Sequence, residues 1–153
     1  MDLPDDGDPL DLDRQVCFPL YAASNLLNRL YRPILAELGL TYPQYLVMLV
    51  LWKKAPRSVG SLGDVLYLDS GTLTPLLKRM ETAGLISRTR DAEDERRVLV
   101  DLTDKGRDLR SEAEKVPGAL ADGLGIDEAS VTRLRDQVRG LVEALNGSTV
   151  KKP

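Results

Sequence analysis

The chain has 153 residues, of which 42 % are hydrophobic and 29 % charged, values typical of a soluble domain with a sizeable core. It contains no histidine, which excludes Ser-His-Asp and Cys-His catalysis and histidine-ligated zinc. Its single cysteine, Cys17, excludes an intrachain disulfide and multi-cysteine metal sites, so we expect no cofactor and no metal. No apolar run approaches the roughly 18 residues of a membrane span, and the acidic first residues differ from a secretion signal. We therefore expect a cytoplasmic protein that does not bind membranes.

The net charge of −3 is unevenly distributed along the chain. Six aspartates and no basic residue occur in the first 13 positions. Residues 53–97, by contrast, hold nine basic and seven acidic groups, a surplus of two positive charges. This surplus is a weak indication of an anionic partner, although mixed charge of this kind is more often a solvated surface.

The first predicted helix follows an acidic arm that we expect to be disordered over residues 1–12. Apolar residues then recur in steps of three and four as far as Leu38, the spacing of an amphipathic helix. Proline is tolerated in the first turn of a helix, so Pro19 predicts that the helix begins at residues 16–18, with Cys17 at its start. Pro33 predicts a kink or a break near Arg32, and Gly39 is a plausible end.

Three shorter helices are expected next. Thr41 and Gln44 form a capping box for a helix that ends near Lys54. After a turn at Ala55-Pro56-Arg57, Ser58 caps a short helix whose inward positions we expect to be Val59, Leu62, Val65 and Leu66. A turn and cap at residues 69–72 leads into a helix that stops at Gly84 and carries an apolar stripe at Leu73, Leu76, Leu77 and Met80.

Two strands and two further helices complete the predicted order. The strands cover residues 85–90 and 97–102, joined by a polar loop. Thr103 caps a helix that we expect to break at Pro117-Gly118, and Asp127 caps the last helix, which ends at Gly147. Its apolar stripe consists of Val131, Leu134, Val138, Leu141, Val142 and Leu145.

A helix-turn-helix followed at once by a two-stranded hairpin is the order of a winged helix, whose second helix enters the major groove of DNA. We therefore predict a mostly helical, α+β fold: a winged-helix DNA-binding domain at 41–103, flanked by a sensing and dimerisation helix at 13–40 and dimerisation helices at 104–147, with a tail at 148–153. The flanking helices carry apolar stripes with too little in one chain to bury them. A second copy under two-fold symmetry is the simplest partner, so we predict a homodimer.

The helix after the turn at residues 69–72 has a polar side suited to DNA. Small residues at its start allow close approach to bases and phosphates, basic residues follow one turn later, and the helix N-terminus favours anions. The predicted contacts are Ser70, Gly71, Thr72, Thr74, Pro75, Lys78 and Arg79. An ordinary capped surface helix would have the same composition.

The hairpin is the second candidate DNA contact. Arg88 and Arg90 lie on one strand, and an arginine at the tip can enter the narrow, negative minor groove. Asp94, two residues before Arg96, can hold that side chain extended through a bidentate pair. A hairpin whose charges only confer solubility is the alternative.

Cys17 is the third feature with possible chemistry. A lone cysteine is usually a small buried hydrophobe. Here it is expected at a helix N-terminus, where the helix dipole favours the thiolate. Four tyrosines follow within 28 residues, and phenol groups can donate hydrogen bonds to a thiolate. The combination suits a peroxide-sensing thiol.

Several segments resemble a known family. Asp-Glu-Arg-Arg-Val-Leu-Val-Asp-Leu-Thr at 94–103 is similar to the wing signature of the MarR superfamily of dimeric winged-helix regulators. Cys-Phe-Pro-Leu-Tyr-Ala at 17–22, Leu-Thr-Tyr-Pro-Gln-Tyr at 40–45 and Leu-Tyr-Leu-Asp-Ser-Gly-Thr-Leu-Thr-Pro at 66–75 resemble the organic-hydroperoxide-resistance repressors within that superfamily. The similarity runs from about Arg14 to Gly118.

The resemblance implies a repressor of double-stranded, pseudo-palindromic operator DNA. Organic hydroperoxides would oxidise the reactive cysteine at Cys17 and release the DNA. Tyr31 and Tyr42 of the opposite subunit would hydrogen-bond the reduced thiol, with Tyr21 nearby. No second, resolving cysteine is present, so a small external thiol, a backbone amide or further oxidation would fix the signal.

Two other functions are consistent with the sequence. One is a MarR-type regulator that responds to a small aromatic ligand, with Cys17 inert. The other is a one-cysteine peroxidase, which lacks polarising groups for repeated turnover and leaves the hairpin unexplained. We therefore expect a regulator rather than an enzyme.

Overall fold

The computed structural model describes residues 7–147, so residues 1–6 of the expected arm and the expected tail at 148–153 lie outside the described residues. The chain forms two compact units, one through Pro117 and one from Gly118 onward. No helix in the described part is long and apolar enough to cross a membrane.

The first long helix, α1, spans Cys17–Ala36 and follows a 3₁₀ turn, η1, at Leu12–Arg14. Cys17 is its first residue, as predicted. Of the kink or break expected near Arg32, the break does not occur, because the helix continues for three residues beyond Pro33. A proline removes one backbone hydrogen bond, but the following turn packs Leu35 into the core at 1 % exposure. Beyond the helix, Gly39 has a φ of +68°, and the Leu40 amide donates to the Leu35 carbonyl at 3.1 Å.

Helix α2 covers Tyr42–Lys53 and begins with the predicted capping box. The Thr41 hydroxyl accepts from the Gln44 amide at 3.4 Å, and the Gln44 side chain accepts from the Thr41 amide at 3.1 Å. Tyr45, Val47, Met48 and Leu51 are its buried residues.

Helices α3 (Val59–Leu66) and α4 (Ser70–Thr82) form the helix-turn-helix, and α4 ends before Gly84, whose φ is +78°. Ser58 and Asp69 are the N-caps. The predicted stripe of α4 is confirmed, since all four of its residues are buried. In α3, Leu62 is buried, but Val65 is 48 % exposed, so the inward placement of Val65 is wrong. An eight-residue helix buries a narrow stripe, and Val65 lies outside it.

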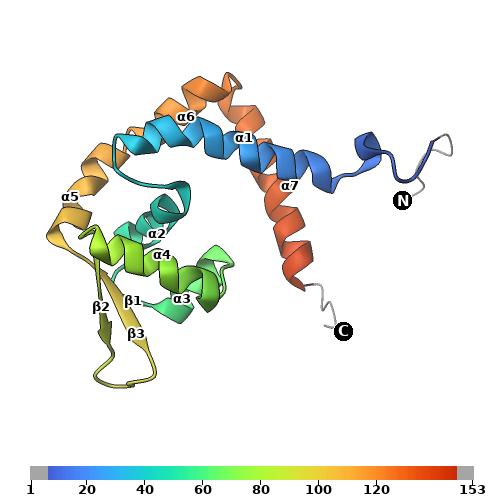
Figure 1. Ribbon diagram of the computed structural model, residues 1–153. Helices are drawn as coiled ribbons and strands as arrows, with labels where there is room; N and C mark the ends of the chain where they lie inside the picture. Colours follow the sequence, from blue (N-terminus) through green and yellow to red (C-terminus); the bar gives the residue numbers. More distant parts are fainter. Residues whose placement is uncertain (1–6, 148–153) are drawn as a thin grey trace. The chain divides into compact units, whose positions relative to one another are not determined.

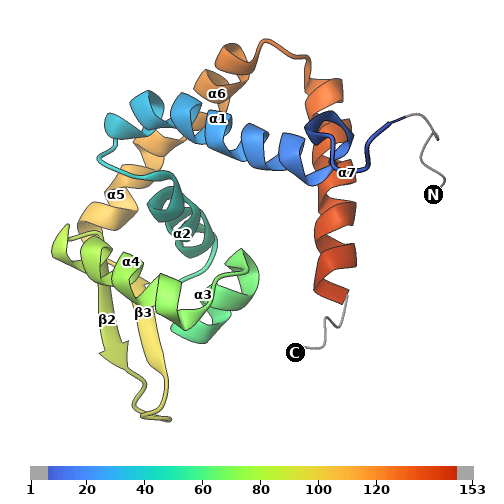
Figure 2. The same ribbon diagram turned by 45° about the vertical axis from the view of Figure 1, so that its right-hand side comes forward.

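The sheet has three antiparallel strands in the order β1-β3-β2: β1 (Arg57–Ser58), β2 (Ile86–Arg90) and β3 (Val98–Leu102). The predicted hairpin is confirmed as β2 and β3, whereas β1 replaces part of the turn expected at residues 55–57. A two-residue strand has no periodicity that a sequence pattern could reveal. In both views the hairpin extends beyond the neighbouring helices (Figures 1 and 2).

Helix α5 (Asp104–Ala113) is capped by Thr103 as predicted, and α6 spans Val116–Leu124. The break expected at Pro117-Gly118 is wrong by about two residues: it lies at residues 114–115, and Pro117 sits in the first turn of α6, where its missing N–H is harmless. Helix α7 covers Glu128–Gly147, and the Asp127 carboxylate accepts from the Ser130 amide at 2.7 Å.

The core of the unit that ends at Pro117 holds the sheet and α2–α4 together. Fully buried residues include Met48, Leu62, Leu77 and Val100. The Trp52 ring N–H donates to the Gly106 carbonyl at 2.9 Å and so ties α2 to α5. The molecule is thus mostly helical with a small antiparallel sheet, and the predicted winged-helix fold is confirmed.

Candidate DNA interface and redox site

The polar side of α4 is fully presented to solvent. Its four buried leucine and methionine residues hold it against the core, and the opposite side carries the predicted contacts. All seven of them are exposed: Ser70, Gly71, Thr72, Thr74, Pro75, Lys78 and Arg79. The Asp69 carboxylate accepts from the Thr72 amide at 2.7 Å, and this hydrogen bond holds the pKa of Asp69 below its ordinary value. The helix therefore starts at a fixed, ionised cap.

Arg88 is engaged within the chain. The Glu81 carboxylate on α4 accepts from the Arg88 amide at 3.1 Å and from its guanidinium at 3.2 Å. The Arg88 side chain is only 24 % exposed. The residue thus connects strand β2 to α4, and its predicted contact with DNA would add to this role.

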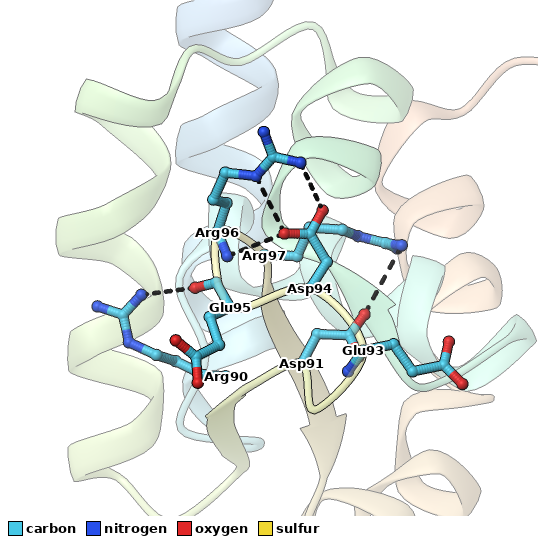
Figure 3. A network of polar contacts seen from close by, with 7 residues as sticks. All are labelled: Arg90, Asp91, Glu93, Asp94, Glu95, Arg96 and Arg97. Carbon is cyan, nitrogen blue, oxygen red and sulfur yellow. Dashed lines mark hydrogen bonds and ion pairs between the residues drawn. The ribbon is translucent and has the colours of Figure 1, made fainter.

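The loop between β2 and β3, which we call the wing tip (residues 91–97), is held by its own charges (Figure 3). The Arg96 guanidinium binds both oxygens of Asp94, at 3.1 and 3.4 Å, which is the expected bidentate pair. This contact lowers the pKa of Asp94. Arg96 nevertheless remains 91 % exposed, so the pair holds a cation extended into solvent. Its entry into a minor groove remains a prediction.

Two further arginines lie at or next to the wing tip: Arg97 within the loop and Arg90 as the last residue of β2. Arg90 donates to the Glu95 carbonyl at 2.8 Å. Arg97, which is absent from the residues predicted to bind DNA, lies 3.7 Å from the Asp91 carboxylate and is 54 % exposed. In Figure 3 Arg90 and Arg97 lie on opposite sides of the loop. Arg97 neighbours Arg96 in the sequence, but only the folded loop shows which way each side chain points.

The Cys17 thiol lies at the first residue of α1 and is exposed. Tyr21 follows one helical turn later and is 68 % exposed. Within residues 7–147 the thiol has no hydrogen-bond partner, and no group of three His, Cys, Asp or Glu side chains suits a metal ion. Position and accessibility are therefore those of a thiol that another molecule can reach.

Tyr31 and Tyr42 form one cluster with their ring centroids 4.6 Å apart. Tyr45, which is not among the predicted sensing residues, joins them at 6.1 and 6.4 Å. Burial, with smaller contributions from Tyr42 and Tyr45, raises the pKa of Tyr31 to about 12. Burial also raises the pKa values of Tyr42 and Tyr45. All three phenols therefore keep their protons at neutral pH and can donate hydrogen bonds.

The predicted sensing residues do not meet within one chain. Cys17 and Tyr31 occupy one continuous helix, 14 residues apart. At a rise of about 1.5 Å per residue, that is a separation of ~21 Å along the axis. Cys17 and Tyr21 thus lie together at the start of α1, whereas Tyr31 and Tyr42 lie together in the tyrosine cluster about 21 Å further along the helix axis. Only a second copy could bring a thiol to the tyrosine cluster.

The chain is similar to known transcriptional regulators. Residues 29–113 match the family model described as transcriptional regulator SarA/Rot. The chain is 45 % identical over 142 residues to the organic hydroperoxide resistance transcriptional regulator of Bacillus subtilis (strain 168), covering 91 % of this chain and 95 % of the relative.

Solved structures of transcriptional regulators are also similar to this chain. AbfR of Staphylococcus epidermidis is 34 % identical, and its reduced and overoxidised forms bound to DNA give TM-scores of 0.71 and 0.72, each covering 88 % of this chain and 94 % of AbfR. A mutant MarR from E. coli complexed with operator DNA shares the fold, with a TM-score of 0.77, 24 % identity and coverage of 88 % of this chain and 99 % of MarR.

Fold, exposed surface and these similarities together define a DNA-binding transcriptional regulator of the winged-helix class. More narrowly, the chain belongs to the family of organic hydroperoxide resistance transcriptional regulators.

Proposed function

We propose that this chain is a homodimeric repressor that leaves its operator when an organic hydroperoxide oxidises Cys17. The observation that carries the proposal is the separation of an exposed thiol from a cluster of protonated phenols by ~21 Å of one helix. In a dimer with two-fold symmetry, the Cys17 end of α1 in one copy can lie beside the tyrosine cluster of the other copy, and the reverse.

Unburied apolar side chains support the homodimer. Phe18 and Leu26 on α1 are 41 % and 59 % exposed, and Leu134 and Leu145 on α7 are 53 % and 65 % exposed. Residues 13–40 and 104–147 are therefore proposed as the dimerisation segments. The winged-helix domain at 41–103 is proposed as the DNA-binding part, in the cytoplasm. Its core is not closed by these residues alone, because Leu35 of α1 and Val116 of α6 belong to the same cluster.

For DNA, the proposed mode places α4 in the major groove and the wing tip in the adjacent minor groove. The two copies would read half-sites about one helical turn, ~34 Å, apart, so the operator should be pseudo-palindromic. Lys78, Arg79 and the exposed Arg96 would supply phosphate and groove contacts. Structures of AbfR bound to DNA support DNA binding by this fold, and the helix and wing placement is part of the proposal.

The proposed sensing step is the two-electron oxidation of the Cys17 sulfur by an organic hydroperoxide. The Cys17 sulfur attacks the terminal oxygen of the hydroperoxide, an S–O bond forms, and the O–O bond breaks. Sulfur loses two electrons and becomes a sulfenic acid, while the hydroperoxide is reduced to its alcohol, which takes up a proton. In this proposal the phenols of Tyr31 and Tyr42, which lie side by side, would hold the reacting sulfur of the other subunit through hydrogen bonds.

Release requires only a modest change in energy. A tenfold loss of DNA affinity corresponds to about 1.4 kcal/mol of differential binding. AbfR has been crystallised on DNA in both the reduced and the overoxidised form. Since an overoxidised relative has been crystallised on DNA, we propose a mixed disulfide as the releasing state. The sulfenic acid of Cys17 condenses with a small external thiol, so that an S–S bond forms, the S–O bond breaks and water leaves. The added group would separate the subunits' tyrosines from the sulfur.

The test is a gel shift on an operator selected from random DNA, with and without cumene hydroperoxide and a small thiol. Wild type should bind DNA and lose it on oxidation, while mass spectrometry records the added mass on Cys17. Cys17→Ser should bind equally well and ignore the oxidant. Loss of DNA by both proteins would refute sensing at Cys17.

A regulator that binds a small aromatic acid remains the second candidate, because a hollow of about 410 Å³ lies between α2 and α5. Aromatic, apolar and basic side chains line it, among them Tyr45, Trp52 and Arg110. In that case an aromatic acid would release the DNA from wild type and from Cys17→Ser alike.

A further inference from the structure

A hollow of about 390 Å³ separates the wing from the two helices of the helix-turn-helix. We call it the wing hollow. The residues that line it and carry the argument are Ser58, Gly60, Thr74, Arg88, Arg96 and Arg97. It thus joins the start of α3, the exposed side of α4 and the wing tip.

The wing hollow is lined by three cations whose partners lie elsewhere. Arg88, Arg96 and Arg97 contribute to its wall. Their carboxylate partners are Glu81, Asp94 and Asp91, none of which is among the described residues that line it. The Nε of Arg88 has no hydrogen-bond partner within residues 7–147. The carboxylates fix the guanidinium groups, while the space itself is bordered by positive charge.

Polar groups with unused hydrogen-bonding capacity border the same space. The Ser58 hydroxyl accepts from the Ser61 amide at 3.1 Å, which leaves its own proton free to donate. Gly60 carries no side chain, and a Cβ added there would meet nothing within 4 Å. Thr74 adds a second hydroxyl from α4. Hydroxyl and guanidinium donors around one space form a set suited to a phosphate.

The geometry of DNA indicates which phosphate could occupy the wing hollow. With α4 in the major groove and the wing tip in the neighbouring minor groove, the sugar-phosphate strand that divides the two grooves has to pass between them. The wing hollow lies between α4 and the wing, because Thr74 of α4 and Arg88, Arg96 and Arg97 of the wing all line it. We infer that it seats a backbone phosphate of this strand, with Arg97 and Ser58 as contacts beyond those expected from the sequence. This inference rests on the proposed docking of α4 and the wing on DNA.

The first test adds a charge to the wing hollow. Gly60→Asp and Gly60→Asn place nearly equal volumes in open space, so they differ mainly in charge. We expect Gly60→Asp to bind operator and non-operator DNA at least tenfold more weakly than Gly60→Asn at low salt, with the two proteins melting at similar temperatures. Equal affinities of the two variants would overturn the inference.

The second test removes a charge. Arg97→Gln is compared with Arg107→Gln, since Arg107 is also an ion-paired arginine, 53 % exposed, but lies on α5 away from the wing hollow. Each phosphate contact contributes about −0.9 to the slope of log K against log salt. Arg97→Gln should make the slope less steep by about that amount per lost contact, equally on operator and non-operator DNA, whereas Arg107→Gln should not.

The outcomes distinguish a failure of the proposed DNA binding from a failure of the wing hollow's role. If wild type binds no DNA at all, the proposed function fails. If wild type binds and Arg97→Gln keeps the wild-type slope, only the wing hollow's role is refuted. A free oxyanion shares the chemistry of a DNA phosphate, so inorganic phosphate is titrated into DNA-free protein. Saturable binding that depends on Arg97, with an unchanged DNA slope, would assign the wing hollow to a small anion and overturn the inference.

Discussion

Glu81 of α4 and Arg88 of β2 are joined by two hydrogen bonds: the carboxylate accepts from the amide of Arg88 at 3.1 Å and from its guanidinium at 3.2 Å. One side chain of the proposed recognition helix therefore holds both the backbone and the side chain of the first wing strand. The angle between the helix and the wing determines whether both grooves can be engaged at once. This pair adds a polar contact to the buried packing of Met80 against the start of β2, and both can help to maintain that angle.

We predict that Glu81→Ala lowers the ratio of operator to non-operator affinity by about tenfold, the equivalent of about 1.4 kcal/mol. Removing a carboxylate near phosphates raises non-specific binding, while the loosened wing weakens specific binding. Fluorescence anisotropy with both DNAs measures the ratio. Glu114→Ala is the matched control, because Glu114 forms a 3.2 Å ion pair with Arg110 on the surface of the same unit. An unchanged ratio in Glu81→Ala would show that the pair does not orient the wing.

Acidic pH should destabilise the fold through carboxylates held by hydrogen bonds. The pKa of Asp69 is lowered below its ordinary 3.8 by the Thr72 amide, and that of Glu81 below its ordinary 4.5 by Arg88. A group with a lowered folded-state pKa stabilises the fold above its unfolded value and loses that contribution as the pH falls through the folded value. The melting temperature should therefore fall below about pH 4.5.

Asp69→Asn isolates one of these groups, because asparagine keeps the capping oxygen without its charge. The melting temperature of this variant should lie below that of wild type at pH 7. The difference should shrink as the pH falls below 3.8, because Asp69 is protonated first in the unfolded chain and, at its lower pKa, later in the folded one. A constant difference between pH 7 and pH 3 would contradict the assignment.

Most of the fold was predictable because its signals are local. The capping box at Thr41, the apolar stripe of α4 and the cap at Thr103 each depend on residues within one or two turns. What could not be predicted depends on distant contacts. Strand β1 exists because Arg57 and Ser58 pair with residues 99–100, more than 40 positions away. The redox site is harder still, since Cys17 and Tyr31 lie on one helix and their expected meeting requires a second chain.

Gly106 should tolerate no side chain. A Cβ at this position would overlap the Leu85 carbonyl and crowd Leu102, so the start of α5 would have to move away from the sheet. Gly106→Ala should cost about 1–3 kcal/mol of unfolding free energy. Gly140→Ala, in the middle of α7 with nothing near the new Cβ, should instead gain roughly 0.5–1 kcal/mol. Chemical denaturation measures both, and a neutral Gly106→Ala would refute the close approach.

Tyr67 caps α3 with a left-handed backbone, at a φ of +56°. Its side chain is 62 % exposed, so little burial offsets the strain of a bulky residue there. Tyr67→Gly should stabilise the fold by roughly 0.5–1 kcal/mol. Gly39→Ala, which forces a side chain into the same region at a φ of +68°, should destabilise it by about 1 kcal/mol. Thermal melting would contradict this account if both substitutions shifted stability in the same direction.

The tyrosine cluster should control the rate at which Cys17 is oxidised. A hydrogen bond to a charged group is worth about 1.5–3 kcal/mol, so loss of the phenols in Tyr31→Phe/Tyr42→Phe should slow the reaction with cumene hydroperoxide tenfold or more. Tyr45→Phe is the control, because Tyr45 is only 4 % exposed and its phenol has little access to a second chain. Mixed dimers reveal which chain supplies the donors. When a Cys17→Ser chain is paired with a Tyr31→Phe/Tyr42→Phe chain, the one remaining thiol faces intact tyrosines only if they come from the partner. Its oxidation should then proceed at the wild-type rate, whereas a slow reaction would mean that each thiol depends on the tyrosines of its own chain.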